Sequence, residues 1–324
     1  MTTSCCKPIG GYFELELAKG DQAYHDSPLA FKSGRSSLQF LLETLRPSLV
    51  YVPFYTCDGL LEPFLNTKVP YVFYEIDELL EPKNLPVIKE NEFFLYINYF
   101  DLKRKTVGKL SEHYKQHFIA DCTLAYFAKG NGRSWFFNSC RKFFGVPDGS
   151  FLYAPATMPM LPEVHQNEEY TVDHLLKRFN GHTSEGYTSF VQNEQLCGGP
   201  VGRMSKLTEH LLSQVDHASV SEKRRSNYQF LHGLLADINK LDLAADKDSV
   251  PMLYPLLLDH AIDKKHLYKK NIFAPTYWTD VLRRTGDGFA FERYLTENLL
   301  PLPIDHRYGQ EHMVCMVNTL KQLL

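Results

Sequence analysis

Hydrophobic and polar positions alternate along the first half of the chain as short apolar runs separated by amphipathic stretches. The runs are rich in β-branched and aromatic residues, which is typical of buried strands. The pattern predicts strands at Leu49–Val52, Tyr71–Ile76, Phe93–Asn98, Phe118–Asp121, Trp135–Ser139 and Ser150–Tyr153. Apolar residues at helical spacing predict helices at Arg35–Leu45, Cys57–Leu65 and Lys109–His117. Because strands alternate with helices, we expect an α/β fold with a mostly parallel sheet flanked by helices.

The pattern changes in the second half of the chain. Two long amphipathic helices are predicted near Met204–Val215 and Ser221–Leu241, followed by a segment interrupted by prolines and a terminal helix. This arrangement predicts a smaller C-terminal α+β domain. We expect residues 1–200 to form an N-terminal arm and the large domain, and residues 201–324 to form the small domain.

Composition narrows the class of protein. The 324 residues carry a net charge of −3, which offers no basic field for nucleic acid. No apolar run approaches the roughly 20 residues of a membrane-spanning helix, and the first residues lack the apolar region of a signal peptide. Seven cysteines, an odd number without a CxxC pair, do not suggest disulfides or zinc, so we expect a cytoplasmic location. His113 and His117 lack a third ligand at suitable spacing, so no metal is expected.

The segment Lys32-Ser-Gly-Arg-Ser-Ser37 precedes a helix with leucines at helical spacing. Glycine permits close backbone approach, and a helix N-terminus offers free N–H groups and a favourable dipole for a phosphate. A serine that only caps the helix satisfies the same pattern.

Polar residues also follow two of the predicted strands. Asp121 ends the strand Phe118–Asp121, and Asn98 ends an earlier one. A carboxylate opposite a pyridine nitrogen keeps that nitrogen protonated and makes the ring an electron sink. Alternatively, Asp121 caps the helix that follows.

Ser139 and Lys142 are three positions apart, between phenylalanines and ahead of Gly145 and Gly149. They could form a serine nucleophile with a lysine base. The hydroxyl could instead bind a phosphate while the lysine forms an imine in a dry, partly aromatic pocket. An isolated lysine in a turn is most often a surface residue. The predicted helix start, Asn98, Asp121 and the Ser-x-x-Lys pair nevertheless follow successive strand ends of one sheet, and a serine hydrolase has no use for Asp121.

With these motifs, the chain resembles the DegT/DnrJ-type sugar aminotransferases, which use pyridoxal 5′-phosphate (PLP) to aminate keto-sugars on nucleotide carriers. Ser33-Gly-Arg-Ser-Ser is similar to the family's helix start, and Asp121-Cys-Thr-Leu is similar to its Asp-Ala-Ala-Gln. Arg141-Lys-Phe-Phe-Gly-Val-Pro-Asp-Gly149 and the tail Leu-Pro-Leu-Pro-Ile-Asp-His-Arg-Tyr308 resemble a shorter, divergent branch. The resemblance implies a fold-type-I PLP transferase that works as a homodimer with shared active sites.

The resemblance also implies residue roles. Lys142 would bind PLP as a Schiff base and later move a proton, while Asp121 would hold the pyridinium nitrogen. Thr123 would lie against one ring face and an aromatic residue from Phe54-Tyr55, with Tyr55 as the candidate, against the other. The phosphate would be bound by the helix start, with Gly34 and the amides of Arg35 and Ser36, and by Ser139.

Three departures from the family pattern stand out. Leu124 replaces a Gln that hydrogen-bonds the cofactor's phenolic oxygen, and Asn98 could supply that bond instead. Tyr55 lies two positions before the usual stacking slot. Arg35 replaces a small threonine, and could pair with the phosphate or lie at the surface.

Two later residues are candidates for substrate contacts. Asn193 falls where the family sends a segment into the neighbouring subunit's site, and Arg307 could meet a substrate carboxylate or phosphate. The predicted function is transfer of an amino group from a donor such as glutamate to a keto acceptor, plausibly a nucleotide-linked keto-sugar. The alternatives are a PLP-dependent sugar dehydratase, which typically replaces the lysine with histidine, and a PLP-binding relative without turnover.

Overall fold

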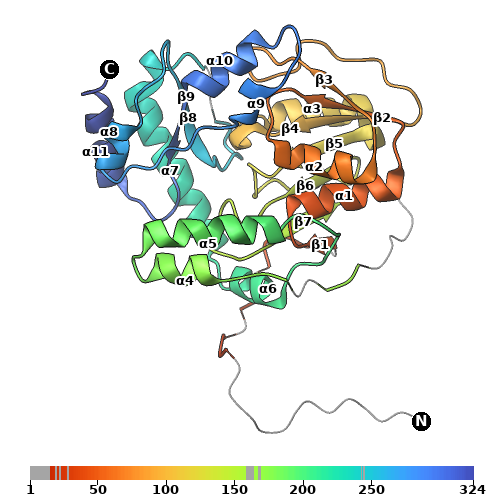
Figure 1. The fold of residues 1–324 in the computed structure, drawn as a ribbon, viewed down its shortest axis with the longest axis horizontal. Helices are drawn as coiled ribbons and strands as arrows, with labels where there is room; N and C mark the ends of the chain where they lie inside the picture. Colours follow the sequence, from red (N-terminus) through yellow and green to blue (C-terminus); the bar gives the residue numbers. More distant parts are fainter. Residues whose placement is uncertain are drawn as a thin grey trace.

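The computed structural model describes residues 15–18, 20, 21, 23–27, 29–157, 164–166, 169–241, 243 and 245–324. Its main feature is a seven-stranded sheet in the order β1-β7-β6-β5-β4-β2-β3 (Figure 1). The strands are β1 (Leu29–Phe31), β2 (Leu49–Pro53), β3 (Tyr71–Tyr74), β4 (Glu92–Ile97), β5 (Phe118–Cys122), β6 (Trp135–Asn138) and β7 (Ser150–Tyr153). All six predicted strands are present.

Parallel pairing runs from β3 through β2, β4 and β5 to β6, whereas β7 and β1 add an antiparallel edge. The prediction of a mostly parallel sheet is therefore confirmed. The carboxyl ends of β5 and β6 are neighbours, because Asp121 pairs in register with Phe137. This arrangement brings together the chain segments that follow these two strands.

The helices of the sheet region are α1 (Gly34–Leu45), α2 (Asp58–Thr67) and α3 (Arg104–Tyr114). The side chain of Ser33 caps α1 by accepting a hydrogen bond from Ser36 N, and Arg46 ends the helix in a left-handed conformation. Leu38, Leu41 and Leu42 are buried on one face of α1, as their spacing predicts. Helices α1 and α2 pack against each other, while α3 packs on β5.

The rest of the chain is mostly helical around a small antiparallel sheet, β8 (Leu253–Leu257) and β9 (Leu299–Pro303). The helices are α4 (Asp173–Phe179), α5 (Thr183–Leu196), α6 (Lys206–Ser213), α7 (His217–Leu235), α8 (Lys265–Lys269), α9 (Asp280–Arg283), α10 (Ala290–Asn298) and α11 (Gln310–Leu320). Figure 1 shows β8 and β9 on the opposite side of the molecule from β2 and β3. The expected C-terminal α+β region is thus present, although α4 and α5 were not predicted.

One buried apolar cluster extends from the large sheet to the β8–β9 region, with Phe31 and Leu320 among its members. Phe31 also forms a bridge with Arg203, so chain segments from both sides of residue 200 share contacts. The domain boundary at residue 200 stays a prediction. The first 14 residues, where the expected N-terminal arm would begin, lie outside the described residues.

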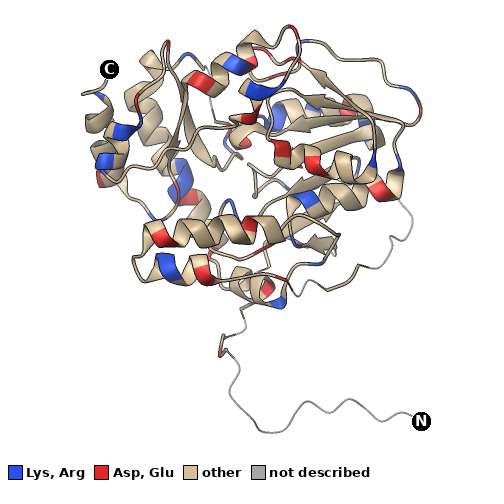
Figure 2. Cartoon of the chain, viewed as in Figure 1, with Lys and Arg blue, Asp and Glu red and all other residues tan. Residues whose placement is uncertain are grey.

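Charges of both signs are interspersed over the helices, as Figure 2 shows for one view of the chain. No helix among the described residues has both the length and the apolar character needed to cross a membrane. Within the same residues, no group of three or more His, Cys, Asp or Glu side chains is placed to hold a metal ion.

Candidate active site

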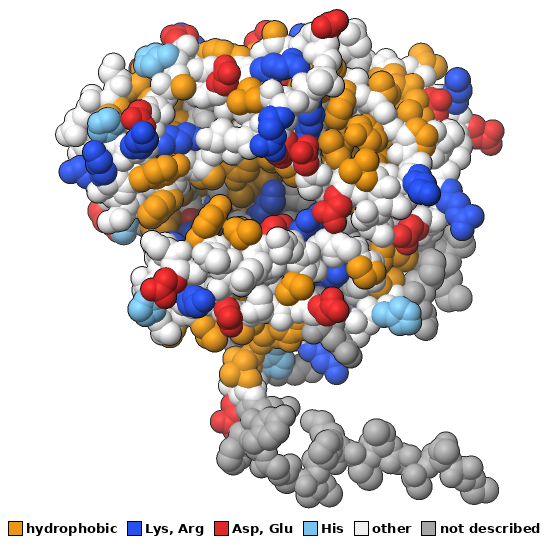
Figure 3. All heavy atoms as spheres, viewed as in Figure 1, with side chains coloured by type: hydrophobic (Ala, Val, Ile, Leu, Met, Phe, Trp, Pro, Cys, Tyr) orange, Lys and Arg blue, Asp and Glu red, His pale blue; other side chains and the backbone are white. Residues whose placement is uncertain are grey.

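A cavity of about 440 Å³ lies where the carboxyl ends of β5 and β6 meet the first turns of α1 and α2. Six of the predicted site residues line it, together with residues described below: Ser33, Gly34, Arg35, Leu38, Cys57, Gly59, Leu60, Asp121, Thr123, Phe137, Ser139, Arg141, Lys142, Phe190 and Glu194. Figure 3 shows the molecule hollowed on this face, with Lys or Arg side chains visible inside the hollow. The predicted helix start, Asp121 and the Ser-x-x-Lys pair thus share one cavity.

Asp121 provides a buried carboxylate in this cavity. The residue is only 3% exposed, and its Oδ1 accepts a hydrogen bond of 2.8 Å from the backbone N–H of Thr123. Burial raises the pKa of the Asp121 carboxyl, and the hydrogen bonds from Thr123 and the charge of Lys142 only partly oppose this effect. The described part of the chain gives Asp121 no ion-pair partner. The carboxylate is therefore suited to a cationic group of a bound ligand.

Lys142 lies in the turn that follows β6, and its side chain is exposed. The turn is fixed by hydrogen bonds from Cys140 N to Gly149 O and from Phe143 N to Cys140 O. Phe143 and Phe144 are buried in a second apolar cluster around Tyr126. They do not line the cavity, whereas Phe137 and Phe190 do, so the cavity around the lysine is partly aromatic but leaves Lys142 exposed.

Ser139 lies three residues before Lys142 and lines the same cavity. No hydrogen bond joins the two side chains in the described structure, whereas a serine nucleophile needs its base within hydrogen-bonding reach. The geometry favours the reading in which Ser139 and Lys142 act on different parts of one ligand.

The start of α1 forms another wall of the cavity. Ser36 N donates to Ser33 Oγ at 3.1 Å, and Ser36 Oγ accepts from Gly202 N at 3.0 Å. Both groups of Ser36 are thus occupied within the protein. The backbone N–H groups of Gly34 and Arg35 belong to the first helical turn and have no partner inside the helix. Of the three residues predicted to bind an anion at the helix start, only Gly34 and Arg35 thus keep backbone N–H groups free for it.

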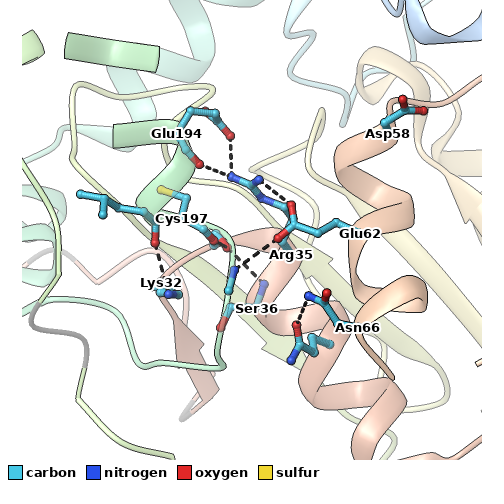
Figure 4. A network of polar contacts seen from close by, with 12 residues as sticks. Lys32, Arg35, Ser36, Asp58, Glu62, Asn66, Glu194 and Cys197 are labelled. Atoms are coloured by element: carbon cyan, nitrogen blue, oxygen red, sulfur yellow. Dashed lines mark hydrogen bonds and ion pairs between the residues drawn. The ribbon is translucent and has the colours of Figure 1, made fainter. Parts of the chain in front are cut away.

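The Arg35 side chain forms ion pairs rather than pointing freely into the cavity (Figure 4). Its Nη1 lies 2.8 Å from Oε2 of Glu62, and its Nη2 lies 2.9 Å from Oε1 of Glu194. The other carboxylate oxygen of Glu194 lies 2.9 Å from Nη1 of Arg141. Burial acts to raise the pKa of Glu194, but Arg141 and Arg35 outweigh it and lower the pKa. Glu194 is thus an anion held between two guanidinium groups.

Tyr55, the predicted stacking residue, does not line the cavity. Its ring is fully buried, with centroid distances of 4.7 Å to Trp278 and 5.8 Å to Tyr99. Cys57, two positions later, lines the cavity in its place. The position at which the family usually stacks an aromatic residue on the cofactor is thus occupied by a cysteine in this chain.

Asn98 is also held away from the cavity. Its Nδ2 donates to Asp101 Oδ1 at 3.0 Å, and its Oδ1 accepts from Lys103 N at 3.1 Å. The side chain stabilises the turn after β4, so the structure does not place it to replace the missing Gln. Leu124 is fully buried in the main apolar cluster and does not line the cavity either.

Asn193 and Arg307, the candidate substrate residues, do not reach the cavity within this chain. Asn193 is buried, donates to Pro147 O at 2.7 Å and accepts from Thr171 N at 3.0 Å. Arg307 pairs with Asp305 through Nε at 2.6 Å. Roles in the cavity of a second chain are not tested by these contacts and stay predictions.

The cavity contains residues that the sequence did not single out, among them Cys57, Arg141 and Phe190. The sequence could have pointed to Arg141, because it is adjacent to Lys142, and to Cys57, because it stands at the position where the family stacks an aromatic residue. Phe190 had no sequence signal, because it comes from α5, which was not predicted.

No protein-family model matches this sequence, and no curated protein matches it. Solved structures do match it. A putative sugar aminotransferase from Streptococcus pneumoniae, in its PMP form, has a TM-score of 0.62 and 14% identity, over 93% of this chain and 87% of that one. A DegT DnrJ EryC1 StrS aminotransferase from Brucella abortus has a TM-score of 0.62 and 15% identity, over 91% and 85%.

PseC from Helicobacter pylori, an aminotransferase involved in the biosynthesis of pseudoaminic acid, has a TM-score of 0.62 and 16% identity, over 91% of this chain and 86% of that one. The fold is that of these aminotransferases. The fold expected from the sequence resemblance is therefore confirmed over about nine tenths of the chain.

Proposed function

We propose that this chain is a PLP-dependent aminotransferase that moves an amino group from a donor such as glutamate to a keto acceptor. The observation that carries the proposal is the single cavity shared by Asp121, Ser139, Lys142 and the first turn of α1. These groups are the carboxylate, the hydroxyl, the amine and the backbone N–H groups that PLP requires. The cavity volume of about 440 Å³ is also within the range of small-molecule sites.

The residues present fit the cofactor. Asp121 is a buried carboxylate without an ion-pair partner in the described structure, and a pyridinium nitrogen would supply the missing cation. Gly34 and Arg35 offer N–H groups at a helix start, where a phosphate is favoured, and Ser139 adds a hydroxyl. When bound, PLP would supply a protonated ring that stabilises negative charge on the carbon bearing the amino group.

Each group of the chain that lines the cavity would have a separate role. Asp121 would keep a proton on the ring nitrogen, and Thr123 N would hold the Asp121 carboxylate in place. Lys142, exposed at the cavity, would attach the cofactor and then carry a proton to and from the reacting carbon. Ser139 and the start of α1 would fix the phosphate end, so that the ring keeps one orientation.

The acceptor class in the proposal is a nucleotide-linked keto-sugar. Support comes from solved structures with this fold: one is named a putative sugar aminotransferase in its PMP form, and another is an aminotransferase involved in the biosynthesis of pseudoaminic acid. The proposal also includes a homodimer with shared active sites and a cytoplasmic location. Exposed aromatic side chains on α4 and α5 support a partner surface there: Phe179, Tyr187 and Phe190, of which Phe190 lines the cavity.

The test is transfer of labelled nitrogen. Purified protein loaded with PLP is mixed with glutamate labelled at its amino nitrogen and a nucleotide-linked 4-keto-sugar, and the products are analysed by mass spectrometry. The proposal predicts labelled amino-sugar from the wild type and none from Lys142→Ala. If the wild type binds PLP but releases neither 2-oxoglutarate nor a labelled amine, the chain is a PLP-binding protein without this activity.

A further inference from the structure

Arg141 carries unused hydrogen-bonding capacity inside the cavity. Its side chain is only 9% exposed, and Nη1 is bonded to Glu194, but Nε and Nη2 are buried without a hydrogen-bond partner among the described residues. Leaving buried donors unsatisfied is costly, most of all on a charged group. A guanidinium with two free, adjacent N–H groups matches the oxygens of a phosphate, which it can bind through two parallel hydrogen bonds.

Glu194 is the anion that pairs with Arg141 in the described structure, through Nη1 alone. Its carboxylate bridges Arg35 and Arg141, and it belongs to α5, whose main packing partner is α4. The Glu194 side chain is 46% exposed, whereas the Arg141 side chain is almost fully buried. A carboxylate released from Arg141 can therefore be hydrated, whereas the guanidinium cannot leave. Arg35 keeps a second carboxylate, Glu62, after such a release.

We propose that Arg141 is an anion-binding residue of this cavity, and that Glu194 is a stand-in carboxylate that a phosphate monoester displaces from it. This inference rests on the proposed function, because the phosphate monoester is that of PLP. A phosphate carries more negative charge than a carboxylate, so it can bind the unpaired Nε and Nη2 through two parallel hydrogen bonds and compete with Glu194 for the charge of the guanidinium. The Gly34 and Arg35 N–H groups and Ser139 would complete the phosphate site.

The test compares binding of PLP with binding of pyridoxal, which lacks the phosphate. Dissociation constants are measured by absorption titration for the wild type, Arg141→Gln and Glu194→Gln. Arg141→Gln should weaken PLP binding about tenfold or more, the loss expected for charge-assisted hydrogen bonds, and leave pyridoxal binding unchanged. Glu194→Gln should strengthen PLP binding by about threefold or more, because the internal competitor loses its charge.

The chain offers matched controls for both variants. Arg133 and Glu112 form an ion pair between exposed side chains, outside the residues that line the cavity. Arg133→Gln and Glu112→Gln should leave both dissociation constants unchanged. Inorganic phosphate provides a measurement on the unmodified protein: it should compete with PLP in the wild type and compete better in Glu194→Gln.

Several results would overturn the inference. Wild-type affinity for PLP in a folded Arg141→Gln variant would do so, as would an equal loss of PLP and pyridoxal binding. If Arg141→Gln does not fold, the Glu194→Gln variant alone decides. The inference is rejected if this variant binds PLP and inorganic phosphate no more tightly than the wild type does. Unchanged PLP binding with a raised KM for glutamate would assign Arg141 to the donor carboxylate instead. If the wild type binds neither PLP nor pyridoxal, the proposed function fails together with the inference.

Discussion

Gly34 faces Thr123 so closely that a Cβ atom built on Gly34 would lie 2.8 Å from Thr123 Cγ2. The same atom would lie 3.3 Å from Asn138 O at the end of β6. Since Thr123 N holds the Asp121 carboxylate, this contact links the helix start of α1 to the acidic side of the cavity. The spacing between the two proposed ends of the cofactor site therefore depends on a residue without a side chain.

Gly34→Ala should weaken PLP binding. The added methyl group must push Thr123 away, and overpacking of this kind costs about 1–3 kcal/mol, or roughly five- to 150-fold in affinity if the cost falls on the bound state. Absorption titration with PLP measures the effect. Gly108→Ala in α3 is the matched control, because a Cβ there meets nothing within 4 Å, so it should keep wild-type affinity. Equal affinity of wild type and Gly34→Ala would contradict the proposal that the spacing between Gly34 and Thr123 sets cofactor binding.

Asp121→Asn should separate binding from catalysis. The amide oxygen can still accept the hydrogen bond from Thr123 N, but it cannot keep a proton on a ring nitrogen by charge. We expect the variant to bind PLP at Lys142 while amino-group transfer slows by about 100-fold or more. Stopped-flow absorption after mixing with glutamate measures the rate. A variant with the wild-type rate would remove Asp121 from the mechanism.

The same substitution should change the pH dependence of stability without PLP. Burial raises the pKa of Asp121 above its ordinary value of 3.8, so the folded carboxyl holds its proton to higher pH than the unfolded one. Its contribution to stability is present below about pH 3.8 and is lost as pH rises through the raised pKa. The side chain of the Asp121→Asn variant cannot ionise. The unfolding free energy of the variant minus that of the wild type should therefore increase as pH rises from about 3.8 through the raised pKa. Urea denaturation over a pH series measures the difference, and parallel curves would contradict it.

His25 should give the opposite slope. Burial lowers the pKa of His25 from 6.5 to about 3, and its ring nitrogens lie 2.8 Å from Tyr153 Oη and 3.1 Å from Asn138 Nδ2. The folded imidazole stays neutral, whereas the unfolded one takes up a proton below pH 6.5, so stability is lost as pH falls from 6.5 towards 3. The loss can reach about 5 kcal/mol.

His25→Gln should flatten this acid limb in urea denaturation curves. The control is His113→Gln on α3, where the side chain is exposed, and it should leave the limb unchanged. An acid limb of wild-type steepness in His25→Gln would show that other groups cause the loss of stability.

The sequence predicted the sheet well because its strands are short apolar runs that the sheet buries. Phe118–Asp121 is an example, since every residue of the observed strand β5 is buried. It missed α4 and α5, whose apolar residues are largely exposed, as Phe179 and Tyr187 are. Without a buried face, the helical spacing of these residues carries little signal.

For the candidate site, the predicted strand ends indicated which chain segments lie near the cavity, but not which way their side chains point. Asp121 and Lys142 line one cavity because they follow neighbouring strands. Tyr55 and Asn98 also follow strand ends, but the loops turn their side chains into an aromatic cluster and a tight turn. Loop conformations depend on contacts distant in sequence, such as the pairing of Glu194 with Arg35, and a single sequence does not specify them.

The claim that Lys142 binds PLP is tested most directly by reductive trapping. The wild type is mixed with PLP, reduced with borohydride and digested, and the modified lysine is located by mass spectrometry. The account predicts one phosphopyridoxyl group on Lys142, and no visible absorption band of lysine-bound PLP in Lys142→Arg. A label on another lysine of the wild type, such as Lys32 beside the helix start, or no label at all, would contradict it.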